Sequence, residues 1–404
     1  MTIDLRARLS VLSDRDFRRF FAGYATSVLG SSMAGVAVAF AVLGTGGGGS
    51  ALGLVMTARI VPLVLLLLLG GASADRFGSR VVMISADVLR CGAQAAFAVV
   101  LLLGHPALVV MLALSAVAGV GEGLFSPALS ALIPRLSPRD RLTQANSLLQ
   151  IVQSGATVAG PALAGVLTAL AGPAVVLALD AASYAVSVLV VFRLPTARPS
   201  TAPKQSLFAD LRAGWSLFRS RTWLWITTAH ICLFNLLVWG PFLVLGPVVA
   251  AAHLGGPRAW GAIMGSYGIG AVGGGLLLLS RRPPRPLLVA VVASLGWAFP
   301  PAALASQLPI GWVCLGAVVA GIGSALCGTL LSTVTQQRIP PEFRGRTSAY
   351  GSLGSFVLGP IGLAAAGPLA SALGTTPVLG FGALWLLIAV AVVAALPTIR
   401  SREL

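Results

Sequence analysis

Charged side chains are scarce in this sequence of 404 residues. Asp, Glu, Lys and Arg together make up 9% of it, whereas 57% of the residues are hydrophobic. The surface of a soluble protein normally requires about a quarter of the residues to be charged. The composition therefore excludes a soluble globular domain and indicates a protein that lies largely within a membrane.

Cysteine and histidine are also rare, and this limits the chemistry that the chain can perform. The four cysteines lie in hydrophobic stretches without the spacing of metal ligands. We interpret them as small packing residues and expect no disulfide framework, no metal site and no other cofactor. A membrane-embedded hydrolase needs clustered His, Asp and Glu or a Ser/His pair within its spans. The predicted spans contain one of the three histidines, His230, and two separated deep acids, which offer neither. We therefore expect a protein that is not an enzyme.

The hydrophobic residues gather in stretches near or above the ~20 residues that a helix needs to cross a membrane. Alternating patterns typical of transmembrane β-strands are absent. We therefore predict an all-α integral membrane protein with twelve transmembrane helices in two pseudo-symmetric six-helix bundles. The predicted spans are 17–44, 50–70, 81–104, 107–133, 143–170, 172–193, 223–248, 258–279, 287–305, 308–335, 346–371 and 375–397.

The longest polar stretch, 194–222, divides these spans six and six. We expect an N-terminal bundle at 1–193, a cytoplasmic linker with a short amphipathic helix at 194–222, and a C-terminal bundle at 223–404. Short patterns recur in both halves: Arg135-Leu-Ser-Pro-Arg-Asp-Arg141 corresponds to Arg338-Ile-Pro-Pro-Glu-Phe-Arg344. Two parallel six-helix repeats are typical of one large class of transporters.

Positive charge is distributed unevenly among the connections. Nearly all of the 27 Lys and Arg residues lie in the N-terminal arm, in alternate connections and in the C-terminal tail, and the other connections contain only Arg258. Basic loops remain cytoplasmic during insertion, so we predict that both termini are cytoplasmic. The basic residues are spread over separate segments, which argues against nucleic acid as a partner and favours contact with anionic membrane lipids.

The connection between the second and third predicted spans reads Gly71-Ala-Ser-Ala-Asp75-Arg76-Phe-Gly78-Ser-Arg80. It resembles the G-x-x-x-D-R-x-G-x-[RK] loop of the major facilitator superfamily, in the position where that family places it. The resemblance implies a gating loop that stabilises the outward-facing state. Asp87 and Arg90, three residues apart on the next span, are predicted to pair and to support this gate. The alternative is a solvated turn whose arginines reflect only the enrichment of basic residues in cytoplasmic loops.

A second motif lies on the fifth predicted span. The segment Gly155-Ala-Thr-Val-Ala-Gly160-Pro161-Ala-Leu-Ala-Gly165 resembles the glycine–proline motif of antiporters in this family, which mostly export their substrates. Small residues allow helices to pack closely, and Pro161 removes one backbone hydrogen bond. Generic packing by small residues is the alternative interpretation.

Acids deep within the spans are the sharpest indication of mechanism, because each costs at least ~2.5 kcal/mol at mid-membrane. Of the 11 acids, only Glu122 in the fourth span and Asp180 in the sixth lie deep. Apolar surroundings favour the neutral form of a carboxyl group, so we predict that both take part in proton coupling. A permanent ion pair with Arg59 is the alternative for Glu122, and packing or assembly is the alternative for Asp180.

Polar side chains at helical spacing on the first, fifth and seventh spans, together with one arginine of the second, predict a cavity for an amphipathic substrate. The alternative is that they form hydrogen bonds between helices. The predicted cavity residues are Tyr24, Ser27, Ser31, Arg59, Gln150, Asn235 and Trp239.

Further segments resemble one bacterial branch of the superfamily, which includes enterobactin and macrolide exporters. They are Ser13-Asp-Arg-Asp-Phe17-Arg-Arg, Ala58-Arg59-Ile-Val-Pro62 and Phe125-Ser-Pro127. The resemblance implies a monomer in the bacterial cytoplasmic membrane that exports a drug, an antibiotic or a siderophore by proton antiport and alternating access. A proton-coupled importer or uniporter of a small metabolite is one alternative, and a non-transporting membrane scaffold is another.

Overall fold

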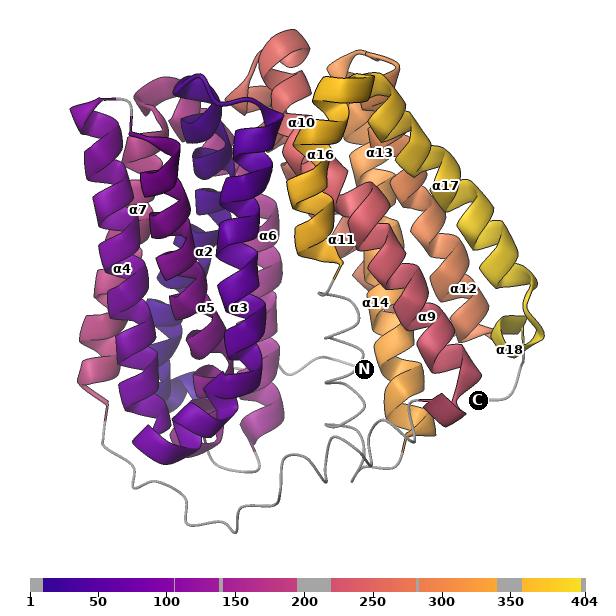
Figure 1. Cartoon of the computed structure of the whole chain (residues 1–404). Helices are drawn as coiled ribbons and strands as arrows, with labels where there is room; N and C mark the ends of the chain where they lie inside the picture. The colour runs from indigo at the N-terminus through magenta and orange to yellow at the C-terminus, as the bar shows by residue number, and fades with distance from the viewer. Residues whose placement is uncertain are drawn as a thin grey trace. The chain divides into compact units, whose positions relative to one another are not determined.

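The computed structural model describes residues 10–104, 106–137, 141–194, 219–280, 283–339 and 358–400, and the backbone of these residues forms helices without any strand (Figure 1). Eleven helices in the described part are long and apolar enough to cross a membrane. A shorter apolar helix, Gly359–Leu373, corresponds to the second part of the predicted eleventh span. This confirms the predicted all-α membrane fold. The predicted amphipathic helix of the linker lies outside the described residues.

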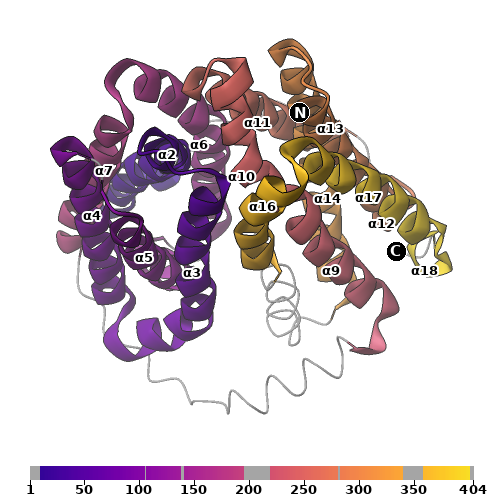
Figure 2. The same ribbon diagram turned by 45° about the horizontal axis from the view of Figure 1, so that its top comes forward.

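By their contacts the residues fall into two units. The first comprises Met1–Gly47 and Leu54–Thr201, and the second comprises Gly48–Gly53 and Ala202–Leu404. The helices of the first unit run side by side in both views (Figures 1 and 2), preceded by a short 3₁₀ turn, Ser10–Ser13. They are α2 (Arg15–Gly44), α3 (Gly49–Phe77, of which Leu54 onward belongs to this unit), α4 (Ser79–Leu103), α5 (Leu108–Leu136), α6 (Leu142–Ala171) and α7 (Pro173–Phe192).

The second unit contains helices whose regular hydrogen bonding is interrupted. The predicted seventh span, 223–248, lies in a helix that continues to Leu254 and contains two π-helical segments, the second of them beyond the predicted end. The predicted ninth span contains a 3₁₀ segment. Such segments often occur at functional sites or hinges. The elements are α9 (Thr222–Phe234), η3 (Asn235–Trp239), α10 (Gly240–Val249), η4 (Ala250–Leu254), α11 (Pro257–Ser280), α12 (Pro286–Ala293), η5 (Ser294–Ala298), α13 (Phe299–Ala305), α14 (Ile310–Arg338), α16 (Gly359–Leu373), α17 (Thr375–Ala395) and α18 (Pro397–Arg400).

The connection between α3 and α4 is shorter than the sequence predicts. The second span is predicted to end at 70, but the helix continues to Phe77 and α4 begins at Ser79. Gly78 alone separates them, with a φ of 88° that an L side chain rarely adopts. The motif from Gly71 to Arg80 is therefore the end of one helix, a single-residue break and the start of the next, rather than an extended loop.

Glycines bring α5 close to its neighbours around Glu122. At Gly121 a Cβ atom would lie 2.6 Å from Cγ of Arg90 and 2.7 Å from the carbonyl oxygen of Ala86, both on α4. At Gly123 it would lie 2.8 Å from the carbonyl oxygen of Leu63 on α3. Small residues permit such close approach of helix backbones in a membrane. The glycine-rich stretch therefore places Glu122 against two helices that carry arginines.

This close contact predicts the effect of Gly121→Ala. The added methyl group must displace the α4 backbone or the Arg90 stem, so we expect a loss of about 1–3 kcal/mol in stability. Thermal unfolding of the purified protein in detergent measures it. Gly92→Ala on α4 is the matched control, because no atom lies within 4 Å of a Cβ at that position. Equal unfolding temperatures for the two variants would contradict the packing described here.

Candidate functional site

A cavity of about 370 Å³ lies within the first unit and is lined by five of its helices. Its walls are both polar and apolar, and they include one acid and two arginines. Among the predicted cavity residues, Tyr24, Ser27, Ser31 and Arg59 line it. Gln150 is exposed elsewhere on α6, and its neighbour Gln153 occupies the wall instead. The other lining residues are Val28, Ser32, Arg90, Glu122, Phe125, Ser126, Leu129, Ala156 and Thr157.

An ion pair joins α3 to α5 in the cavity wall. Nε of Arg59 donates to Oε2 of Glu122 at 3.0 Å, and Nη2 lies 2.9 Å from the same oxygen. The side chains are 23% and 39% exposed, respectively, so neither is sealed in the core. Pairing offsets much of the cost of placing both charges in a membrane interior. Because the pair borders open space, a bound molecule can reach it.

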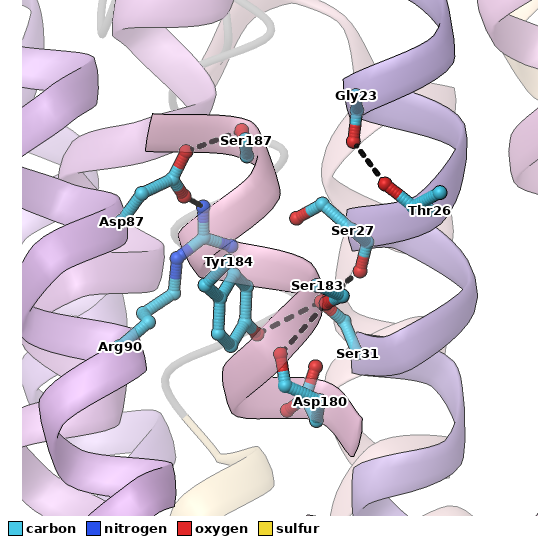
Figure 3. A network of polar contacts seen from close by, with 10 residues as sticks. All are labelled: Gly23, Thr26, Ser27, Ser31, Asp87, Arg90, Asp180, Ser183, Tyr184 and Ser187. Atoms are coloured by element: carbon cyan, nitrogen blue, oxygen red, sulfur yellow. Dashed lines mark hydrogen bonds and ion pairs between the residues drawn. The ribbon is translucent and has the colours of Figure 1, made fainter. Parts of the chain in front are cut away.

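A second ion pair joins Asp87 and Arg90 of α4; Asp87 is completely buried, and Arg90 is nearly so although it reaches the cavity wall (Figure 3). The other oxygen of Asp87 accepts a hydrogen bond from Ser187 of α7 at 2.6 Å. The Arg90 guanidinium lies between two rings, 4.1 Å from the centroid of Phe125 and 4.3 Å from that of Tyr184. Cation–π contacts with desolvated arginine are strong, so this pair fastens α4 to both α5 and α7.

Asp180 of α7 is completely buried and is absent from the cavity wall. Its Oδ2 atom accepts a hydrogen bond from the Gln94 amide at 3.0 Å, and its Oδ1 atom has no hydrogen-bond partner. Oδ1 faces α2 at Gly30, where a Cβ atom would lie 2.7 Å from it. Both acids that were predicted to couple protons therefore lie in one unit, one at the cavity and one behind it.

The polar stripe of α2 contacts two other helices while it lines the cavity. The hydroxyls of Ser31 and Tyr184 are 2.8 Å apart, and Ser31 also donates to the carbonyl of Ser27 (Figure 3). The Tyr24 hydroxyl donates to Oε1 of Gln153 at 2.9 Å. The stripe therefore lines the cavity and also forms interhelical hydrogen bonds.

The predicted gating residues are only partly described. The side chains of Asp75 and Arg76, and the surroundings of Gly71, lie outside the described residues. Arg80 at the start of α4 donates to the carbonyl oxygens of Val191 and Phe192. These carbonyls end α7, where a cation is favoured by the helix dipole. Arg80 therefore ties the motif to the end of α7.

Within the glycine–proline motif of α6, only Gly160 makes a close helix contact that is described. A Cβ atom there would lie 2.6 Å from Cβ of Ser32 on α2. Gly155 has no atom within 4 Å of such a position, and Pro161 lies inside the continuous helix α6. Gly165 is buried. The motif thus packs α6 against α2 at Ser32, next to the polar stripe.

The two candidates of the second unit, Asn235 and Trp239, lie on the π-helical segment η3. Trp239 packs edge-on against Trp297, with ring centroids 4.8 Å apart, and Trp239 also lies 6.1 Å from Tyr267. The Trp297 indole donates to Ser324 at 2.6 Å. Trp239 therefore belongs to an aromatic cluster, whereas the charged cavity is formed by the first unit alone.

Comparison with known families decides the class of protein. The model of the Major Facilitator Superfamily matches residues 20–363. The chain belongs to this superfamily. It is accordingly a multi-pass membrane transporter, not an enzyme.

The relatives of this transporter include drug exporters. It is 28% identical over 365 residues to the multidrug efflux pump Tap of Mycobacterium tuberculosis, and the match covers 85% of this chain and 84% of Tap. It is 25% identical over 358 residues to macrolide efflux protein A of Streptococcus pyogenes, covering 86% and 87% of the two chains. Among solved structures, the nucleoside transporter NupG matches with a TM-score of 0.69 at 17% identity, covering 97% of this chain and 99% of NupG. This last likeness shows the fold alone.

Several site residues of the transporter are missing from the candidates that the sequence suggests. Gln94 donates to Asp180, whereas Tyr184 and Phe125 cover the guanidinium of Arg90. One signal was present: Asp87, Arg90 and Gln94 form a stripe at i, i+3 and i+7 on one helix face. Tyr184 likewise follows Asp180 by one turn.

The enclosed ion pair predicts a large effect for Asp87→Asn. The substitution leaves the Arg90 charge buried without a counter-charge, and breaking a buried pair in this way costs about 3–5 kcal/mol. We expect a strongly lowered unfolding temperature and yield in detergent. Val88→Ala is the control on the adjacent residue, whose side chain is 52% exposed. A variant Asp87→Asn that is as stable as this control would refute the structural role of the pair.

Proposed function

We propose that this transporter exports amphipathic small molecules from the bacterial cytoplasm in exchange for protons, by alternating access of its two six-helix bundles. The observation that carries the proposal is the Arg59–Glu122 ion pair, whose two side chains border the cavity. Its relatives named as a multidrug efflux pump and as a macrolide efflux protein support export and drug-like substrates. The uneven distribution of arginines supports cytoplasmic termini.

The chemistry of the wall supports an amphipathic substrate. Val28, Phe125 and Leu129 offer apolar surface, and Ser27 and Ser126 offer hydroxyl groups on the same cavity. A volume of about 370 Å³ falls within the range of roughly 300–1,000 Å³ that is usual for small-molecule sites. A molecule with an apolar body and a few polar groups fits these walls.

The ion pair explains how such a molecule would be exchanged for a proton. A proton on Glu122 removes the carboxylate charge and releases Arg59, and a polar group of the substrate can separate the same two side chains. Proton and substrate thus compete for one pair, which is the requirement for antiport. Each ligand shifts the equilibrium between the transporter's conformational states by the difference in its affinity for those states. Because proton and substrate act on the same ion pair, binding of one changes the affinity for the other.

The proposal predicts that Glu122→Gln strongly reduces proton-driven transport. The amide cannot take up and release a proton, so we expect concentrative transport of ethidium or erythromycin to fall roughly tenfold or more, in line with coupling energies of about 1–3 kcal/mol. Exchange of labelled for unlabelled compound without a gradient should persist. The measurement uses purified protein in lipid vesicles with an imposed pH gradient.

Asp16→Asn is the control, because it removes an acid at the start of α2 outside the cavity wall. In antiport an acidic lumen drives accumulation of the compound, whereas in proton-coupled import an acidic exterior does so. If accumulation of the compound required an acidic exterior, the protein would be a proton-coupled importer and not an exporter. Accumulation driven equally well by the wild type and Glu122→Gln would exclude Glu122 as the coupling residue.

A further inference from the structure

A groove of about 780 Å³ lies within the second unit, where the proposed exchange of protons has no part. It runs between the seventh-span elements η3 and α10 on one side and the helices α16 and α17 on the other. Its lining residues are all Leu, Val, Phe, Ala, Gly or Pro. It therefore differs in kind from the cavity of the first unit, whose wall carries charged and hydroxyl groups.

Small residues and diverging helices create this groove. α16 and α17 are joined at Gly374 and diverge from that end in both views (Figures 1 and 2). On one side α16 packs tightly on η3, since a Cβ atom at Gly362 would lie 2.6 Å from the carbonyl oxygen of Leu236. On the other side Gly380 of α17 has no atom within 4 Å of such a position. The space at Gly380 is therefore left open by the protein itself.

The groove is open to the hydrocarbon of the membrane. Leu373, Phe381 and Leu384 on its rim are 63%, 58% and 56% exposed, and they lie on apolar helices of the membrane-spanning region. Apolar spaces exclude water, and an empty groove loses the dispersion contacts of its walls. Sites for drug-sized molecules contain a few polar groups that orient the ligand, and this wall offers none from a side chain. A hydrocarbon chain is the ligand that fits.

The length of the groove matches one leaflet of the membrane. Along α16 it extends from Gly362 to Leu373, which is about 16 Å at the rise of an α-helix. Half of the hydrocarbon layer is about 15 Å thick. Its end at Gly374 belongs to the set of connections whose only basic residue is Arg258, and this set is outermost by the charge rule. The groove thus runs from the outer surface to the middle of the membrane.

We infer that this groove binds one acyl chain of a lipid in the outer leaflet, with the carbonyl end at the α16–α17 connection and the methyl end near Leu236 and Leu384. The site recognises the chain and not the headgroup, because residues 358–380 contain no charged side chain. The hydroxyls of Ser371 and Thr376 at the outer end donate to backbone carbonyls. The chain completes the packing of α16 and α17 around η3.

Photolabelling of the purified full-length protein in lipid vesicles tests this site. The probes are phosphatidylcholines with a diazirine near either the carbonyl or the methyl end of one acyl chain, and the labelled residues are mapped by mass spectrometry. We expect the first probe to label Leu373 and Pro377, and the second to label Leu236 and Leu384. Phosphatidylglycerols with the same chains should give the same pattern, because the headgroup is not recognised.

Two residues of α17 outside the groove report on ordinary contact with lipid. Ile388 and Val392 are 57% and 59% exposed, about as much as the groove residues, and neither lines the groove. Each groove residue should be labelled more strongly than these two. Equal labelling would mean that only the general lipid shell is present, and labelling of Leu373 by the methyl-end probe would mean that the chain enters from the other leaflet. Either result would overturn the site.

Gly380→Leu fills the groove and should remove the chain. The new side chain starts in open space, so the fold can accept it, and we expect labelling of the groove to fall roughly tenfold, which corresponds to about 1.4 kcal/mol. Labelling of Ile388 should not change. Gly275→Leu on α11 is the matched control, because it also has no atom within 4 Å of a Cβ and lies outside the groove.

Two further results would contradict a lipid chain in the groove. Undiminished labelling in Gly380→Leu would place the chain elsewhere, and loss of labelling when ethidium or erythromycin is added would make the groove a drug site. The positional labelling of the wild type does not depend on either variant. The proposed function is tested separately by the pH-gradient experiment, since no group of the groove takes up a proton.

Discussion

The first unit is organised by the need to balance every charge that it holds inside a membrane. Two arginines and three acids occupy its interior, and their contacts decide which helices lie together. The Asp87–Arg90 pair is almost completely buried and is held by α5 and α7, and only Arg90 reaches the cavity wall, so the pair serves the fold. The Arg59–Glu122 pair is similar in chemistry but borders a cavity, so it is free to respond to a ligand. Exposure, rather than residue type, separates the two roles.

The second unit packs its buried polar side chains among aromatic rings and not in ion pairs, as far as the described residues show. Its described helices cluster aromatic rings around Trp297 and include two π-helical segments, and the buried His230 is joined to Ser294 and stacked on Trp385. The described hydrogen bonds there join His230 to Ser294 and the Trp297 indole to Ser324, so neutral partners take the place that opposite charges have in the first unit. The two sequence halves share motifs, yet the ionisable chemistry of the described residues is concentrated in one of them.

Much of this arrangement could be predicted from the sequence, because long hydrophobic stretches define spanning helices and because charges within them are so few. Arg59 is the predicted partner of Glu122 in the ion-pair interpretation, and the two side chains do meet. Arg90 also reaches this level, with its Cγ against Gly121, but it pairs with Asp87. The contacts of Gln94 and Tyr184 could not be predicted, because they depend on how each helix is rotated about its axis. Arg80 caps α7 through carbonyl oxygens, and backbone acceptors leave no mark in a sequence. The extension of α3 to Phe77 was missed because glycine and polar residues there are typical of a turn.

The single-residue break at Gly78 has a mechanical consequence. A longer connection would allow one helix to tilt without moving the next. Here only the two backbone dihedral angles of Gly78 can change between the helices. α3 carries Arg59 and α4 carries Arg90, so the two arginines of the interior lie on helices that are joined by one residue. A change in the tilt of α3 therefore displaces the first turn of α4, whose Arg80 is hydrogen-bonded to the end of α7.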